Sequence, residues 1–137
     1  MLPPQIALIT ILTDDVQRLV AFYRDALGFV PKDPANSDAS YCEFTSPGVR
    51  FAICARSVMY GATDEAVYQQ PRGGESFELA FPCTDAAAVD ATYATLVAQG
   101  ARGVKAPARM PWGQYTAFFA DPDGNIHEVF AEAPAEG

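Results

Sequence analysis

Glu128 is the residue of this chain whose surroundings in the sequence are best suited to chemistry. It lies in the middle of residues 126–130, an apolar stretch of strand composition that also contains the single histidine, His127. Side chains alternate along a strand, so Glu128 and His127 are expected on opposite faces. A carboxylate in an apolar pocket can act as a general acid or base, bind a cationic group, or ligate a metal ion. Whether the chain is an enzyme or a binding protein depends on which of these partners Glu128 meets.

A tight turn and a second strand are predicted to hold this carboxylate in place. Pro122 suits the second position of a turn and Gly124 can adopt a positive φ angle, so residues 121–124 are predicted to form the turn. Residues 115–120, before the turn, have strand composition. The sequence therefore predicts a β-hairpin that carries Glu128 on its second strand.

The composition is typical of a small acidic protein with one domain. The chain has 137 residues, of which 50% are hydrophobic, and no apolar run is long enough to cross a bilayer. Three dispersed cysteines argue against a disulfide framework, and we expect a cytoplasmic protein without a secretory signal. The net charge of −8 argues against nucleic-acid binding and favours a cationic or neutral small ligand, although it also serves solubility.

The first half of the chain predicts a strand, a helix and further strands. Residues 5–12 form a continuous apolar run of strand length, and apolar residues at helical spacing follow over 16–27. Asp14 and Gln17 resemble a capping box at the start of this helix, and Gly28 is suited to close it. The other elements predicted here are a short strand at 29–30, a loop over 31–39, and strands at 41–45 and 49–56.

The second half predicts the same order of elements after a connector. Residues 57–76 are polar and punctuated by Gly and Pro, so they are predicted to connect the halves with one short helical turn. The elements predicted after it are a strand over 77–83, a helix capped by Asp85 and closed by Gly100, a short strand over 103–106, a loop over 107–113, and the closing hairpin.

Three pairs of residues indicate that the halves are an internal repeat. Asp15 matches Asp85, Gly28 matches Gly100, and Gly48 matches Gly124, at separations of 70, 72 and 76 residues. We therefore predict an α+β fold of two tandem βαβββ modules within a single domain over residues 1–137. The modules are predicted to form a curved mixed sheet around a concave cleft, with the helices outside. Module one spans 5–56, the connector spans 57–76, and module two spans 77–132.

Two motifs lie at matching places in this repeat. The first is residues 9–15 running into 21–29, and the second is Trp112 and Gly113 followed by 119–125 and Glu128. Together they resemble the vicinal oxygen chelate superfamily, which includes glyoxalase I, bleomycin-resistance proteins and extradiol dioxygenases. The resemblance covers residues 5–132 and implies paired βαβββ modules, usually assembled as a homodimer. It is closest in character to the metal-depleted, bleomycin-resistance-like branch.

The resemblance also implies four positions where metal-using members place their ligands. In this chain those positions are occupied by Leu8, Ala52, Glu78 and Glu128. Leu8 and Ala52 cannot coordinate a metal, and two carboxylates alone could hold only a hard ion such as Mg²⁺, weakly. Zn²⁺ and Fe²⁺ normally need three protein ligands, usually including His, and His127 is expected on the wrong face. We therefore expect no metal cofactor; the alternative is a divalent ion, completed by a dimer partner.

Glu78 and Glu128 are also candidates for a pair of carboxylates in the cleft. If they are buried close together, one holds a proton at neutral pH and could serve as a general acid or base. Otherwise each accepts hydrogen bonds within the cleft or from a ligand. The resemblance implies that Trp112 helps to line the cleft, and the alternative is that it covers the edge of the core. The remaining candidates for the ligand site, with core packing as their alternative role, are Tyr115, Phe118, Tyr41 and Phe44, together with Arg56 as a group that could bind an anion.

These observations lead to two hypotheses about function. The first is a metal-independent, antibiotic-resistance-like protein that sequesters a cationic or aromatic small molecule between apolar walls and the carboxylates Glu78 and Glu128. The alternative is a lyase, isomerase or dioxygenase of the same fold, which uses a divalent metal or a Glu as acid and base. Neither hypothesis involves nucleic acid or a membrane, and both are consistent with a homodimer.

Overall fold

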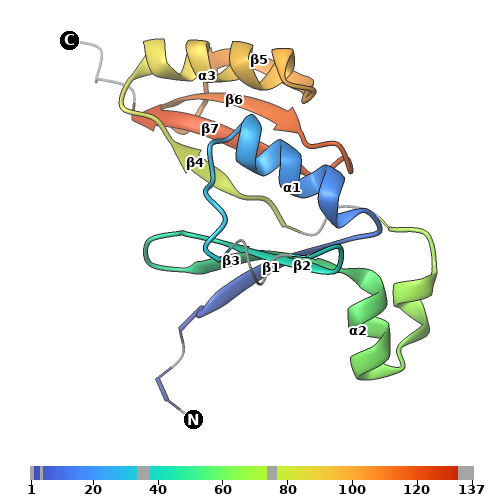
Figure 1. Cartoon of the computed structure of the whole chain (residues 1–137). Coiled ribbons are helices and arrows are strands. Elements are labelled where there is room, and N and C mark those ends of the chain that lie inside the picture. The colour runs from blue at the N-terminus through green and yellow to red at the C-terminus, as the bar shows by residue number, and fades with distance from the viewer. Residues whose placement is uncertain (1, 4, 34–37, 74–76, 133–137) are drawn as a thin grey trace. The chain divides into compact units, whose positions relative to one another are not determined.

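The computed structural model describes residues 2–3, 5–33, 38–73 and 77–132 (Figure 1). The chain divides into two compact units, residues 1–73 and 74–137, and each is described here by itself. The boundary falls inside the connector that the sequence predicts between the two modules.

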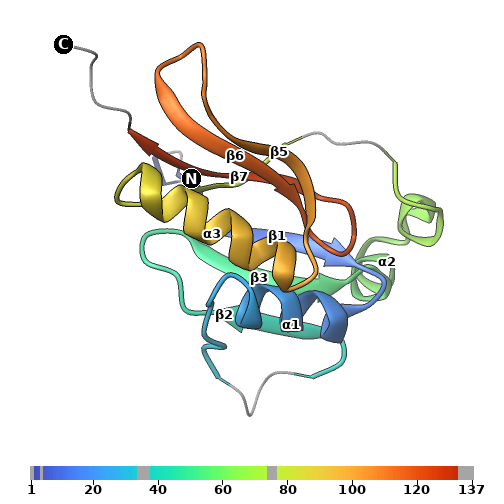
Figure 2. The same cartoon turned by 90° about the horizontal axis from the view of Figure 1, so that it is seen from above.

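Unit 1 consists of a three-stranded mixed sheet with a helix on one face (Figures 1 and 2). The strand order is β1 (Leu8–Thr13), β3 (Arg50–Ala55), β2 (Tyr41–Phe44), with β1 parallel and β2 antiparallel to β3. The helix α1 (Val16–Asp25) packs on this sheet through an apolar stripe. The strand predicted at 29–30 is reduced to an isolated bridge between Pro31 and Phe44.

The start of α1 corrects one prediction. The residue that caps the helix is Asp15, whose Oδ1 accepts a hydrogen bond from the backbone N–H of Arg18 at 3.1 Å. The sequence predicted Asp14 in this role because Gln17 follows it at capping-box spacing. Asp15 takes the role because the helix begins at Val16, one position later than that spacing requires.

A cluster of aromatic rings fills the space between α1 and the sheet. Tyr23, Phe29, Phe44 and Phe51 contact one another with ring centroids 5.1–6.3 Å apart. Contacts of this kind add to the free energy gained from burying the rings. Phe44, a candidate for lining a ligand site, is 1% exposed and belongs to this core.

The connector has more helix than the sequence predicts. It contains α2 (Arg56–Thr63) and the 3₁₀ helix η2 (Ala66–Gln69), where one short turn was expected. Arg56 joins them, because its Nη2 donates to the carbonyl oxygen of Val67 at 2.8 Å while Nη1 lies 3.4 Å from the Asp14 carboxylate. Gly61 argued against a helix here, but this tertiary contact offsets its low helix propensity.

Unit 2 consists of a four-stranded mixed sheet with α3 (Ala86–Ala98) along one face (Figures 1 and 2). The strand order is β4 (Ala80–Pro82), β7 (Ile126–Glu132), β6 (Gln114–Ala120), β5 (Arg102–Arg109). The strand β4 is parallel to β7, and the other neighbours are antiparallel.

The ends of these elements follow the sequence closely, except at β4 and β5. The strand β4 spans only Ala80–Pro82, whereas the sequence predicted a strand over 77–83. Asp85 caps α3 by accepting from the N–H of Ala88 at 2.8 Å, as predicted. The hairpin turn is held by Asp121, whose Oδ1 accepts from the N–H groups of Asp123 and Asn125, both at 2.9 Å. The strand β5 is longer than predicted and continues through residues 107–109, because an edge strand tolerates Pro107 and two register shifts.

The α+β class and the repeated order of elements are confirmed. Unit 2 has the full βαβββ order, and unit 1 has the same order with its second strand shortened to the bridge at Pro31. Within the described part of the chain, no helix has the length and apolar character needed to cross a membrane.

Candidate ligand-binding site

Glu128 lies near the middle of the sheet of unit 2. Its strand β7 runs between β4 and β6, where Glu128 is opposite Ala80 on one side and Phe118 on the other. Its backbone N–H donates to the carbonyl oxygen of Leu79 at 3.0 Å. By strand alternation it shares a face with Phe130, whereas His127 faces the other way. This face, carrying Glu128, Phe118, Phe130 and Thr116, is called the Glu128 face below.

The side chain of Glu128 is largely buried, but its carboxyl oxygens keep some contact with solvent and accept no hydrogen bond from a described residue. The residue is 9% exposed, and no described residue donates a hydrogen bond to its carboxylate or forms an ion pair with it. Burial raises the pKa of Glu128, and the negative charge of Glu78 raises it further. Glu78 precedes β4 by two residues and is itself exposed. The charge of Glu78 thus disfavours the ionisation of Glu128, but because Glu78 is exposed the two are not the pair of buried carboxyls that the sequence hypothesis required.

A second polar group without a partner lies on the same face. Thr116 is opposite Phe130 in the hairpin and is completely buried. Its hydroxyl oxygen has no hydrogen-bond partner among the residues that the structure describes. Buried polar atoms are nearly always paired, so an unpaired one needs an explanation, such as an ordered water or a ligand. Phe118 and Phe130, both half-buried, supply apolar surface beside the two polar groups.

Thr116 and Phe130 are the residues of this face that were not among the candidates predicted from the sequence. The signal was available in the hairpin, because its turn fixes the register of the two strands. Ala120 pairs with Ile126, and because the strands are antiparallel, each residue closer to the N-terminus of β6 pairs with one closer to the C-terminus of β7. Thr116 thus comes opposite Phe130, on the Glu128 face.

His127 has a structural role on the opposite face of the sheet. It is 1% exposed, and its ring makes edge contacts with Phe81 and Phe119. Its Nδ1 accepts a hydrogen bond from the backbone N–H of Leu79 at 3.0 Å. Burial lowers the pKa of His127, and the charge of Asp121 opposes this effect only in part. The lone pair that could ligate a metal is therefore already used.

The residues at the four family ligand positions do not fit a zinc or iron site. Leu8 and Ala52 lie on β1 and β3 in unit 1 and have no donor atoms. Glu78 and Glu128, in unit 2, supply two carboxylates without a histidine. No three His, Cys, Asp or Glu side chains within the described ranges are grouped so that they could hold an ion. Because Zn²⁺ and Fe²⁺ sites usually have at least three ligands including His, these four residues do not provide the ligands of such a site.

The other candidates in unit 2 point away from Glu128 or toward solvent. Tyr115 donates from its hydroxyl to Oδ1 of Asp90 on α3 at 2.7 Å, so it belongs to the helix side of the sheet. Trp112 is 60% exposed, and its Nε1 donates to Oε1 of Gln114 at 3.1 Å. Phe118 is therefore the one of these three aromatic candidates that lies on the Glu128 face.

The candidates in unit 1 do not form one site. Tyr41 donates from its hydroxyl to Glu43 at 3.2 Å, and that carboxylate also accepts from Lys32 and Arg50. The hydrogen bond from Arg50, and to a smaller extent that from Lys32, lowers the pKa of Glu43 to about 2. Arg56 is buried at the junction of α2 and η2, as described above, and Phe44 is in the aromatic core.

The fold belongs to a known class of proteins. The family model of the Glyoxalase/Bleomycin resistance protein/Dioxygenase superfamily matches residues 5–129, and the chain belongs to this superfamily. The superfamily predicted from the two motifs is thus confirmed, whereas the bleomycin-resistance-like branch stays a prediction.

Individual relatives agree with this assignment. The chain is similar to the uncharacterized protein YraH of Bacillus subtilis (strain 168), at 29% identity over 124 residues, covering 89% of this chain and 94% of YraH. A crystal structure of a glyoxalase/bleomycin resistance protein/dioxygenase family enzyme from Burkholderia phytofirmans PsJN has a TM-score of 0.82 at 23% identity, covering 92% of this chain and 97% of that one. A crystal structure of lactoylglutathione lyase from Agrobacterium tumefaciens has a TM-score of 0.68 at 23% identity, covering 94% of each chain. These structures show a shared fold.

Proposed function

We propose that this protein binds a small molecule on the Glu128 face and sequesters it without a metal ion. The observations that support this are the fully buried hydroxyl of Thr116, which has no partner among the described residues, and beside it the largely buried carboxyl group of Glu128, which accepts no hydrogen bond from them. Leaving a buried polar group unpaired costs about 1–3 kcal/mol, and more for a charged group. A ligand that supplies a donor recovers this free energy on binding.

The chemistry of the Glu128 face favours a ligand with a cationic or donor group attached to a flat apolar body. An ammonium group beside Glu128 would favour the ionised form of its carboxyl, which opposes the burial and the charge of Glu78 that raise the pKa of Glu128. Hydrogen bonds to a charged group contribute about 1.5–3 kcal/mol. Phe118 and Phe130 offer surface for an aromatic ring. The net charge of −8 would attract such a cation over longer distances.

A binding experiment with two matched variants tests this proposal. Metal-free protein without a tag is screened by calorimetry against cationic and neutral aromatic compounds, and the best cationic compound is then measured on Glu128→Gln and Glu132→Gln. Glu132 lies at the end of the same strand and is exposed, so it is the control. We expect at least tenfold weaker binding for Glu128→Gln and an unchanged affinity for Glu132→Gln. Equal affinity of both variants would contradict the proposed site.

A second candidate function is catalysis by Glu128 as a general acid or base. Its raised pKa is the observation in favour, because a carboxyl group that titrates nearer to neutral pH can both donate and accept a proton. The similarity in fold to lactoylglutathione lyase makes a lyase or isomerase the natural class to assay. Under this alternative, Glu128→Gln keeps ligand affinity but loses turnover, whereas under sequestration wild type has no turnover to lose.

Metal content separates the metal-independent proposal from a metalloenzyme of the same fold. Protein purified without chelators is exposed to divalent ions, dialysed and analysed for bound metal. We expect less than one-tenth of an ion per chain. About one tightly held ion per chain would show that our count of ligands is wrong. We also propose that the protein acts as a cytoplasmic homodimer, and light scattering of the purified chain tests the dimer.

A further inference from the structure

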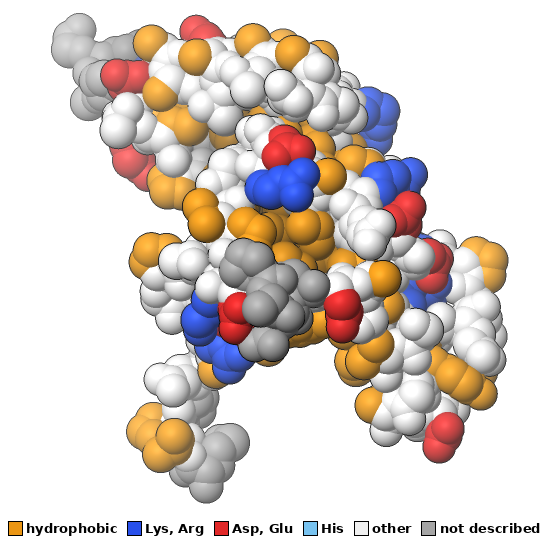
Figure 3. Space-filling model, viewed as in Figure 1, with side chains coloured by type: hydrophobic (Ala, Val, Ile, Leu, Met, Phe, Trp, Pro, Cys, Tyr) orange, Lys and Arg blue, Asp and Glu red, His pale blue; other side chains and the backbone are white. Residues whose placement is uncertain are grey.

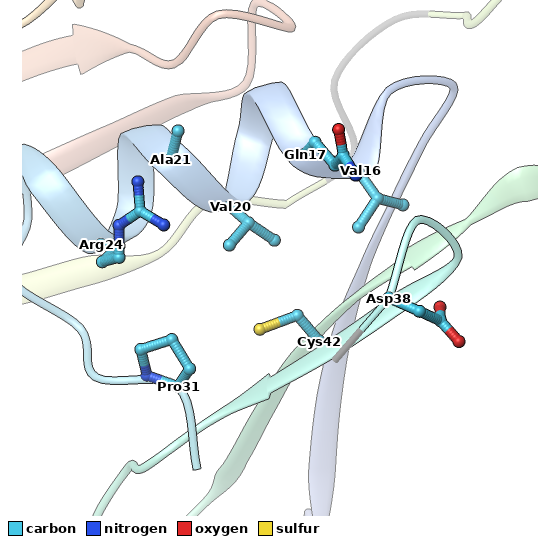
Figure 4. A pocket seen from close by; sticks show the side chains of 8 residues that line it. All are labelled: Val16, Gln17, Val20, Ala21, Arg24, Pro31, Asp38 and Cys42. Carbon is cyan, nitrogen blue, oxygen red and sulfur yellow. The ribbon is translucent and has the colours of Figure 1, made fainter. Parts of the chain in front are cut away.

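A second pocket, separate from the Glu128 face, lies within unit 1 between α1 and β2. Its volume is about 470 Å³, and its walls are mostly apolar. Val16, Val20 and Ala21 come from α1, Pro31 from the chain after the helix, and Cys42 from β2. Val16 and Val20 point toward Cys42 across the pocket (Figure 4). In the space-filling view, hydrophobic side chains gather in the hollow below α1 (Figure 3).

The charged side chains around this pocket are already paired within the protein. Arg24 forms two hydrogen bonds with the carboxylate of Asp25, at 2.7 and 2.9 Å. Asp38 accepts from the N–H and the hydroxyl of Ser40, both at 2.7 Å, and from the N–H of Tyr41 at 3.1 Å. A charged ligand would have to compete with these partners, whereas a neutral one would not.

Gln17 and Cys42 are the other pocket residues whose side chains carry a polar atom. The side-chain amide of Gln17 hydrogen-bonds to none of the described residues, so it can serve one donor or acceptor of a ligand. Cys42 is 2% exposed and points to the side of β2 that faces α1, and its thiol donates to the carbonyl oxygen of Glu43 at 3.8 Å. Cys54 pairs with Tyr41, the neighbour of Cys42, and therefore lies on the opposite face of the sheet. Sulfur makes favourable contacts with aromatic rings, worth about 0.3–1.5 kcal/mol for a thioether.

We propose that this pocket binds a neutral aromatic molecule that carries one hydroxyl or carbonyl group. The ring packs between the valines of α1 and Cys42, and the polar substituent hydrogen-bonds to the amide of Gln17. The volume is sufficient, because an apolar cavity of about 150 Å³ already accepts benzene. It also falls within the range of about 300–1,000 Å³ that is usual for small-molecule sites.

The test uses 1-naphthol, a neutral two-ring compound with one hydroxyl group, and the full chain labelled with ¹⁵N and ¹³C. NMR spectra are recorded during a titration at pH 7. We expect saturable shifts of the Val16 and Val20 methyl groups and of the Gln17 side-chain amide. Shifts confined to β6 and β7 would assign the probe to the Glu128 face and overturn the proposal, and so would the absence of saturable shifts up to millimolar concentration.

Two variants with the same substitution then test the pocket by filling it. Val20→Phe places a ring inside the pocket, and Val97→Phe makes the same change on α3, at a residue that is 42% exposed and outside the pocket. We expect at least tenfold weaker binding of 1-naphthol to Val20→Phe and a change of less than twofold for Val97→Phe. Similar affinities of the two variants would overturn the proposal. If Val20→Phe fails to fold, the shift map of the unsubstituted chain still decides the question.

Discussion

Replacing His127 by Phe or Asn separates the two ways in which this residue supports the sheet of unit 2. Phe preserves a ring against Phe81 and Phe119 but removes the acceptor of the Leu79 N–H group. Asn can place its carbonyl oxygen near the position of Nδ1 but loses the ring. We expect His127→Phe to lower the free energy of unfolding by about 1–3 kcal/mol, the cost of a buried donor left unpaired.

The pH dependence gives this prediction a second readout. The pKa of His127 is lowered in the folded protein, so the unfolded chain binds the proton more readily. The stability contributed by the neutral ring is fully present above pH 6.5, the ordinary pKa of His, and is lost as the pH falls below it. The slope can reach about 1.4 kcal/mol per pH unit. Both variants lack this slope.

Urea unfolding of the wild type and both variants between pH 7.5 and pH 5.5 measures these quantities. Glu128 contributes a slope of opposite sign, because its raised pKa makes the folded protein the better proton acceptor. The variants keep Glu128, so subtraction from the wild type isolates His127. A His127→Phe variant that is as stable as the wild type and equally sensitive to acid would refute this account of the residue.

Four further predictions follow from the described contacts. Thr116→Val keeps the shape of the side chain but removes the unpaired hydroxyl, so we expect unchanged or higher stability in urea and, if the hydroxyl contacts the ligand, weaker binding by calorimetry. Gly103→Ala places its Cβ against the hydroxyl of Tyr93, so we expect a loss of about 1–3 kcal/mol that Tyr93→Phe partly restores; no restoration would exclude this clash as the cause. Asp85→Ala removes the cap of α3 and should cost about 0.5–2 kcal/mol, seen as a lower urea midpoint, and an unchanged midpoint would contradict this role of Asp85. Glu43 has a pKa of about 2, below its ordinary value of 4.5, so its contribution to stability is present above pH 4.5 and is lost as the pH falls toward 2; an NMR titration that finds an ordinary pKa would contradict this.

Much of the fold was predictable because its signals are local. The caps at Asp85 and the turn at residues 121–124 rely on residues that satisfy their own neighbouring backbone, and both are present as predicted. The helical connector was not predictable, since Arg56 stabilises it through Val67 and Asp14, residues that are distant in sequence. Pro107 was mistaken for a loop residue because its effect depends on whether its strand lies at an edge.

The candidate site was predictable to a similar degree. Strand alternation was enough to separate Glu128 from His127 and to select Phe118. The same alternation places Tyr115 on the face opposite Phe118, so listing the two residues together was wrong, as the contact of Tyr115 with Asp90 on α3 shows. Alternation was not enough for Phe44, which packs in a core formed by residues from four different segments. The unpaired hydroxyl of Thr116 could not be predicted, because a sequence shows which groups can form hydrogen bonds but not which of them lack a partner.

The irregular path of β5 also bears on how this protein avoids aggregation. An exposed edge strand can pair with a strand of another molecule and so begin the growth of a fibril. In β5 the pairing register shifts twice, Pro107 lacks an N–H group, and Lys105 places a charge between the two shifts. A variant with Pro107 and Lys105 replaced by Val would present a more continuous row of unpaired backbone N–H and C=O groups along this edge than the natural sequence does. The small irregularities of β5 thus protect a sheet whose other residues have strongly strand-forming side chains.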